Sequence, residues 1–85
     1  MEQFTYKIKD PVGIHARPAG QLVKMVKELS SSVTIAKGDK SVSAVKLIAI
    51  MGLGVRTGDT ITVTVEGENE KVDSARLKSF LEERL

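Results

Sequence analysis

The sequence predicts an α+β fold, a βαββαβα open-faced sandwich in which a four-stranded antiparallel sheet is covered by three helices on one face. Two patterns indicate this fold. Apolar and polar residues alternate in four short segments, as in strands that are buried on one face only. Three other segments repeat apolar residues at helical spacing. The length of 85 residues suits a single domain, residues 1–85, with one core.

Strands are predicted where the alternation has a period of two. Four segments show it: 4–9, 33–36, 41–44 and 60–66. Residues 10–13, Asp-Pro-Val-Gly, end the first strand, and Gly38-Asp39 forms a two-residue hairpin turn between the second and the third. The first two strands flank a helix, and such a crossover leaves a gap for the fourth strand between them, the split βαβ arrangement.

Helices are predicted at three places. The first covers residues 16–29, where Pro18 is tolerated because its missing N–H has no partner in the first turn, and it leaves His15 at the N-cap. A brief helix starts at Leu47 and ends at residues 52–54, with Gly54 as a left-handed cap. The last helix covers residues 68–85. Its buried face is predicted from five apolar residues: Leu77, Phe80 and Leu81, flanked by Val72 and Ala75.

The composition excludes several classes of protein. The chain has no Cys, which excludes a disulfide scaffold, a thiol nucleophile, a zinc knuckle and an iron–sulfur cluster. Its longest mostly apolar run, residues 47–55, is far shorter than the roughly 20 residues of a membrane span. From its mixed polar first residues we expect no signal peptide. A net charge of +2 is too small to indicate nucleic-acid binding. We expect a cytoplasmic monomer without metal, cofactor, nucleic acid or membrane insertion.

The single His of the chain is the candidate for chemistry. His15 lies in residues 13–18, Gly-Ile-His-Ala-Arg-Pro, before a helix whose free N–H groups, those of Ala16 and Arg17, point back at it. The positive end of the helix dipole favours the neutral, nucleophilic ring. The guanidinium of Arg17 is a planar fork of donors suited to phosphate oxygens. This combination indicates an acceptor site for a phosphoryl group.

Structural explanations of the same residues stay open at this point. A lone His before a helix is commonly a polar N-cap residue that satisfies a backbone group, and Arg17 could be a solvated surface charge. The glycines of residues 52–58 have the wrong spacing for a dinucleotide or phosphate loop and are explained by a helix cap and a turn.

Two further groups of residues have both a structural and a functional interpretation. The first is basic and forms either a rim around His15 or ordinary solvated surface: Lys24, Lys27 and Lys46. The second is apolar and forms either core or an exposed docking patch: Leu47, Ile48 and Met51. A six-residue helix cannot bury all of its sides, so both interpretations can hold for the apolar group.

These residues together resemble the HPr family, the histidine-containing phosphocarriers of the phosphoenolpyruvate-dependent sugar phosphotransferase system. The resemblance covers the whole chain and is most specific at residues 13–19, Gly-Ile-His-Ala-Arg-Pro-Ala, and at 51–54, Met-Gly-Leu-Gly. It implies that enzyme I phosphorylates His15 at Nδ1, that Arg17 binds the phosphate, and that sugar-specific IIA proteins or domains receive it. It also implies a docking surface on eight residues: Ala16, Gln21, Lys24, Lys27, Leu47, Ile48, Met51 and Gly52.

One position departs from the family pattern. Many Gram-positive members have a regulatory Ser at the start of the short helix, where an ATP-dependent kinase phosphorylates it, and this sequence has Lys46 there. Ser43 is the nearest hydroxyl, and its spacing does not match. We therefore expect no regulatory phosphorylation at this position.

Two other functions compete with the carrier. A regulatory interaction module of the same fold would act through the basic and apolar docking surface and leave His15 idle, but the intact pair of His15 and Arg17 argues against it. A nucleic-acid-binding domain would need stacking aromatics on its sheet, and the chain has only Phe4, Tyr6 and Phe80.

Overall fold

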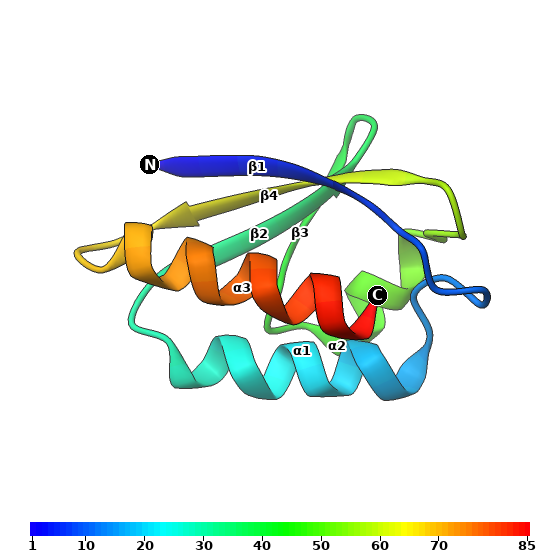
Figure 1. Ribbon diagram of the computed structural model, residues 1–85, viewed down its shortest axis with the longest axis horizontal. Helices are drawn as coiled ribbons and strands as arrows, with labels where there is room; N and C mark the ends of the chain where they lie inside the picture. The colour runs from blue at the N-terminus through cyan, green and yellow to red at the C-terminus, as the bar shows by residue number, and fades with distance from the viewer.

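Four strands and three helices follow one another in the computed structural model, which describes residues 1–85 (Figure 1). The strands are β1 (Glu2–Lys7), β2 (Ser32–Lys37), β3 (Lys40–Ser43) and β4 (Thr60–Glu66), and the helices are α1 (Ala16–Glu28), α2 (Leu47–Gly52) and α3 (Glu70–Arg84). All strand pairs are antiparallel, in the order β1-β4-β2-β3, and the helices lie on one side of the sheet (Figure 1). The predicted open-faced sandwich is confirmed.

The last strand of the chain, β4, lies inside the sheet between the first two. Val63 of β4 faces Phe4 on β1 and Ile35 on β2. Alternate residues of β4, Ile61 and Val63 among them, are almost completely buried, because side chains alternate across a strand and the helices cover one face. The gap left by the β1-α1-β2 connection is therefore filled as the split βαβ arrangement predicts.

The helices bury stripes of apolar side chains against this face. α1 contributes Ala19, Leu22 and Val26, which are spaced three and four residues apart, and α3 contributes Leu77 and Leu81. The short α2 buries only Ile50 and packs beside α1. All three helices are too short or too polar to cross a lipid bilayer.

The buried face of α3 differs from the predicted one. The helix begins at Glu70, not at residue 68, and Val72 and Ala75, expected beside the core, are exposed. Asp73 is buried instead, because it lies four residues before Leu77 and thus on the same side of the helix. Its Oδ2 accepts a hydrogen bond of 2.6 Å from the hydroxyl of Ser31, which satisfies the buried carboxylate.

Other differences are shifts of one or two residues at element ends. β1 covers Glu2–Lys7, whereas residues 4–9 were expected. β3 covers Lys40–Ser43, whereas residues 41–44 were expected, yet the Ala44 N–H still donates to the Val33 carbonyl at 2.9 Å. Gly38 in the hairpin has a φ of +61° and Gly54 after α2 has a φ of +65°, as the predicted turn and helix cap require.

Candidate functional site

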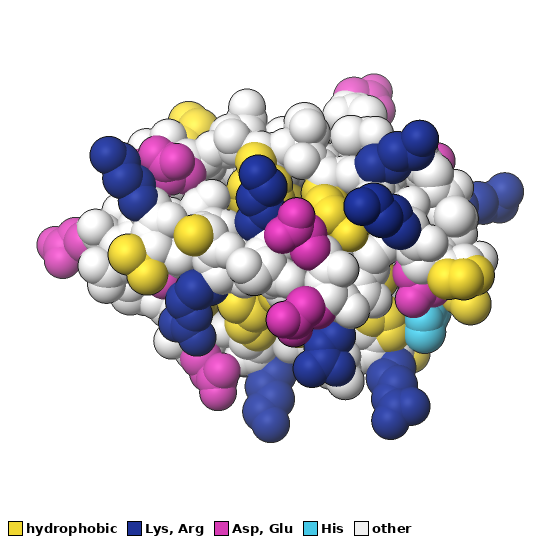
Figure 2. Space-filling model, viewed as in Figure 1, with side chains coloured by type: hydrophobic (Ala, Val, Ile, Leu, Met, Phe, Trp, Pro, Cys, Tyr) yellow, Lys and Arg dark blue, Asp and Glu magenta, His cyan; other side chains and the backbone are white.

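His15 occupies the N-cap of α1 without acting as a side-chain cap. Its backbone is extended, with φ −132° and ψ 178°, and its carbonyl accepts the Ala19 N–H at 3.0 Å. The ring makes no capping hydrogen bond, so the explanation of His15 as an ordinary capping residue is wrong. The side chain is 40% exposed and lies at the molecular surface next to an acidic side chain (Figure 2). The imidazole is thus free for chemistry.

A tight turn holds His15 in place. Gly13 has a φ of +79°, and a Cβ there would lie 2.6 Å from the Val55 carbonyl oxygen. That carbonyl accepts the N–H of the buried Ile14 at 3.1 Å. Only glycine allows this approach, so the loop before His15 is fastened to the segment between α2 and β4.

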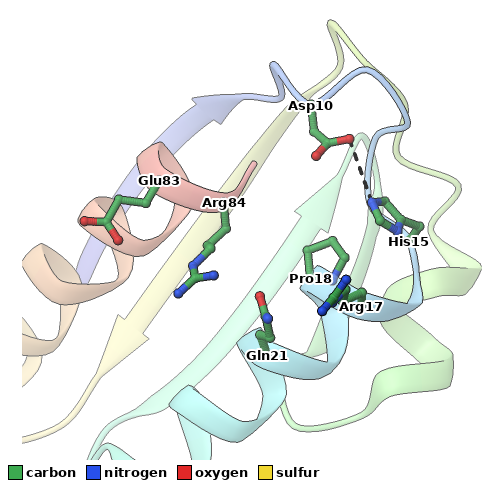
Figure 3. A pocket seen from close by; sticks show the side chains of 7 residues that line it. All are labelled: Asp10, His15, Arg17, Pro18, Gln21, Glu83 and Arg84. Atoms are coloured by element: carbon green, nitrogen blue, oxygen red, sulfur yellow. Dashed lines mark ion pairs between the residues drawn. The ribbon is translucent and has the colours of Figure 1, made fainter.

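The ring lines a polar cavity of about 290 Å³ built from three parts of the chain. Its lining residues come from the loop after β1, the first turns of α1 and the end of α3 (Figure 3): Asp10, His15, Arg17, Pro18, Gln21, Glu83 and Arg84. Arg84 points toward Gln21, whereas the carboxylate of Glu83 points away from the ring (Figure 3). Two cationic side chains, Arg17 and Arg84, therefore line the same cavity as His15.

Asp10 is the charged partner nearest to the ring. Its Oδ1 lies 3.8 Å from His15 Nε2 and accepts the Val12 N–H at 2.8 Å. In the sequence Asp10 was interpreted only as part of the turn that ends the first strand. Nothing in the sequence of the last helix indicated that Glu83 or Arg84 would lie near His15. These contacts depend on how distant segments fold together.

Arg17 and the first turn of α1 provide unused hydrogen-bond donors. Arg17 is exposed and forms no ion pair or side-chain hydrogen bond within the chain. The N–H groups of Ala16 and Arg17 lie in the first turn, where an α-helix has no acceptor for them. Together they suit a group with several negative oxygens.

The predicted docking residues on α1 form a stripe rather than a ring around His15. Gln21 lines the cavity, and Lys24 is seven residues beyond Arg17, two turns along the same side of the helix. Lys27 is about 18 Å from His15 along the axis, at 1.5 Å per residue. Lys and Arg side chains project along the edge formed by α1 (Figure 2). The expected basic rim is therefore elongated.

The predicted apolar patch lies on α2, beside α1. Ile48 is 80% exposed and Met51 39%, whereas Leu47 is half-buried and packs against the core. Lys46 is exposed at the N-cap of the helix, and Gly52 is exposed at its end. Ile48 and Met51 therefore lie on the surface, and Leu47 belongs partly to the core and partly to the surface patch.

A polar network fixes the segment after α2. Lys37 Nζ lies 2.9 Å from the Gly54 carbonyl oxygen and 2.9 Å from Asp59 Oδ2. The Arg56 N–H donates to the same carboxylate at 2.9 Å. These two donors, Arg56 first and then Lys37, hold the pKa of Asp59 below its ordinary value.

The comparisons with known proteins agree on one family. A family model described as the PTS HPr component phosphorylation site matches residues 2–83. The phosphocarrier protein HPr of Buchnera aphidicola is 45% identical over 71 residues, which cover 84% of each chain. The HPr of Lysinibacillus sphaericus is 37% identical over 96% of this chain and 91% of the relative.

A solved structure shows the same relationship in three dimensions. The crystal structure of HPr-C-His from Thermoanaerobacter tengcongensis has a TM-score of 0.92 and 33% identity, covering 99% of this chain and 94% of the other. The sequence match and the fold both extend over nearly the whole chain. The chain therefore belongs to the HPr family, the phosphocarriers of the phosphotransferase system.

Proposed function

We propose that this chain accepts a phosphoryl group from phosphorylated enzyme I on His15 and passes it to IIA proteins or domains. The observation that carries the proposal is the free imidazole at the N-cap of α1, in one cavity with the unpaired Arg17. The lone pair of a ring nitrogen attacks phosphorus, and the guanidinium and the first-turn N–H groups bind the phosphoryl oxygens. The chain acts as a carrier that other proteins load and unload, in a single domain of residues 1–85.

The test is loading from phosphoenolpyruvate. The protein is incubated with phosphoenolpyruvate and enzyme I, and its intact mass is measured. We expect one acid-labile, base-stable phosphate in the wild type and none in His15→Ala. A stoichiometric phosphate on the His15→Ala protein would overturn the assignment. The Lys40→Ala protein, changed in the exposed hairpin, is the control and should load normally.

We propose that partners dock on the α2 patch and the basic stripe of α1, with Ala16, Gln21 and Gly52 at their border. A carrier must leave each partner, so the interface should be small, below about 1,200 Å² in total. Lysines around an apolar centre favour an acidic partner surface, and association should weaken with salt.

Two exposed apolar residues give a matched test of this surface. Ile48 on α2 and Val72 on α3 are both mostly exposed, 80% and 62%, so neither change to Ala should affect stability by more than about 0.5 kcal/mol. Only Ile48→Ala should weaken binding to enzyme I, measured by titration at low and high salt. Equal effects of both changes, or binding that ignores salt, would place the docking surface elsewhere.

We further propose a cytoplasmic monomer. A structure of HPr from Thermoanaerobacter tengcongensis is described as a dimer, so the oligomeric state needs its own measurement. Sedimentation at micromolar concentration should give a mass near 9.2 kDa. A stable species of twice this mass would replace the monomer with a dimer.

The regulatory module remains the second candidate because the exposed α2 patch suits protein binding whether or not His15 reacts. The Lys46 side chain lies at the start of this patch and offers no hydroxyl to a kinase. Incubation with an HPr kinase and labelled ATP should label Lys46→Ser but not the wild type. A partner that binds the His15→Ala protein and is regulated by it would favour the module over the carrier.

A further inference from the structure

The loop after β1 places a carboxylate against one edge of the His15 ring. Asp10 Oδ1 lies 3.8 Å from His15 Nε2, and the dashed line in Figure 3 marks this contact. Both side chains are partly accessible, 23% for Asp10 and 40% for His15. The separation is longer than a hydrogen bond, and contacts of this kind commonly tighten in the reacting complex.

Four contacts from separate parts of the chain fix Asp10. Its N–H donates to the Leu85 carbonyl at 2.8 Å, and its own carbonyl accepts the Thr57 hydroxyl and the Gly13 N–H, the latter at 3.0 Å. Its carboxylate accepts the Val12 N–H at 2.8 Å. A surface carboxylate held by both backbone and side chain has little freedom, so its position beside Nε2 is built into the fold.

We propose that Asp10 is a positioning residue that fixes the proton of His15 on Nε2 and leaves the lone pair on Nδ1. This inference rests on the proposed function. A carboxylate only accepts hydrogen bonds, so the ring edge that faces it carries the N–H, and a neutral imidazole has only one. The other nitrogen, Nδ1, then holds the lone pair that attacks phosphorus. Asp10 thereby determines which ring nitrogen reacts.

The same carboxylate stabilises the product of the reaction. The Nδ1 lone pair forms the new N–P bond while the bond from phosphorus to the donor breaks and its electron pair leaves with the donor. Nε2 keeps its proton, so the ring becomes a phosphoimidazolium with a positive charge. That charge develops next to the Asp10 carboxylate. In the return transfer the N–P electron pair goes back to Nδ1, and the ring is neutral again.

The other charges around the ring make this role specific. Arg17 and Arg84 line the same cavity, and the N-terminus of α1 adds partial positive charge, all of which oppose a cationic ring. Glu83 also lines the cavity, but its carboxylate points away from His15 (Figure 3). Of the two acidic side chains that line the cavity, Asp10 is therefore the one that faces the ring.

The test separates the charge of Asp10 from its role in the turn. Asp10→Asn keeps an oxygen for the Val12 N–H and removes the charge, and Asp10→Ser keeps a hydroxyl acceptor in the same place. Asp39→Asn is the control, because it removes one negative charge from the exposed β2–β3 turn. Three quantities are measured: the ¹⁵N chemical shifts of the unphosphorylated ring, the rate of loading by enzyme I, and the ring nitrogen that carries the phosphate.

We expect both Asp10 variants to load about fivefold more slowly than the wild type, which corresponds to about 1 kcal/mol for a unit charge near 4 Å in water. Their ¹⁵N shifts should show less proton on Nε2, and more phosphate should appear on that nitrogen. Asp39→Asn should match the wild type in all three.

Unchanged shifts and rates in the Asp10 variants would overturn the role of Asp10 and leave the proposed function intact. Equal slowing by Asp39→Asn would also overturn it, because the effect would then be one of net charge. A wild type that gains no phosphate on His15 would instead overturn the proposed function. The ¹⁵N shifts test Asp10 even then, since they are read on the unphosphorylated protein.

Discussion

The polar side chains near the two ends of α1 differ in burial and in whether they have a hydrogen-bond partner within the chain. At the N-terminal end the side chains of His15 and Arg17 are accessible and form no hydrogen bond within the chain, and the nearest charged group to the ring is Asp10 at 3.8 Å. Beyond the C-terminal end Ser31 is buried and donates to the buried Asp73 at 2.6 Å. Groups in water lose little by lacking a partner in the chain, whereas buried groups must be paired. The unpaired end is thus available to a ligand, and the paired end serves the fold.

Gly13 lies just before the unpaired N-terminal end of α1, and the fold itself depends on it. Its replacement should therefore change the free energy of unfolding more than any other variant below. A Cβ at Gly13 meets the Val55–Arg56 backbone, and its φ is positive. Gly13→Ala should lower the free energy of unfolding by about 2 to 4 kcal/mol and slow loading of His15, because the loop must move. Chemical denaturation and the loading assay measure both.

Gly20→Ala is the control for Gly13. Gly20 lies inside α1, and a Cβ there meets nothing within 4 Å. Alanine is the better helix former, so this change should be neutral or stabilise by up to about 1 kcal/mol. Equal destabilisation by both changes would show that the Val55 contact does not matter.

Asp73→Ala should lower the stability of the fold and leave the chemistry at His15 unchanged. The change leaves the buried Ser31 hydroxyl without its acceptor, which should cost about 1 to 3 kcal/mol of unfolding free energy. Loading of His15, at the other end of α1, should keep its rate below the melting transition. Thermal denaturation and the loading assay test this.

The double variant Ser31→Ala/Asp73→Ala sharpens the result. It removes both polar groups, so it should be less destabilised than the sum of the two single variants. Strict additivity would mean that the hydrogen bond between Ser31 and Asp73 contributes nothing.

Arg17→Lys should slow phosphoryl transfer and leave the stability of the fold unchanged. Lysine keeps the charge but loses the planar pair of donors, so phosphoryl transfer should slow by about tenfold, or about 1.4 kcal/mol. Unfolding free energy should change by less than about 0.5 kcal/mol, because Arg17 has no partner in the chain. Arg76→Lys, on α3 outside the His15 cavity, is the control for transfer. A large loss of stability with normal transfer would reassign Arg17 to the fold.

Asp59 should give the smallest effect and a pH signature. Its pKa is lowered by the Arg56 N–H and then by Lys37, so folding favours the charged carboxylate. The stability it adds is complete above the ordinary value of 3.8 and is lost as pH falls through the lower folded pKa. The melting temperature of the wild type should exceed that of Asp59→Asn at pH 7, and the difference should vanish at the acid end. A difference in melting temperature that does not change with pH would show that the effect of Asp59→Asn does not come from ionisation of the carboxylate.

Much of the site was predictable because it is local in sequence. Gly13, His15 and Arg17 lie within five residues, and a helix start converts that spacing directly into a free ring beside free N–H groups. The chemical roles of His15 and Arg17 and the docking roles of Gln21, Lys24 and the α2 residues stay predictions. Asp10 was missed, because whether a carboxylate five residues before His15 turns toward the ring depends on the loop between them.

The sequence by itself determined the seven elements, the hairpin at Gly38, the cap at Gly54 and the motif around His15. Period and turn chemistry act between neighbours, so they are legible without the fold. Only the tertiary structure decided that Asp73 rather than Val72 faces the core and that Glu83 and Arg84 line the His15 cavity. Ser31 and Asp73 are 42 positions apart, and Arg17 and Arg84 lie near opposite ends of the chain. Such pairs meet because β4 inserts between β1 and β2 and returns α3 alongside α1, an arrangement set by burial of the whole sheet face.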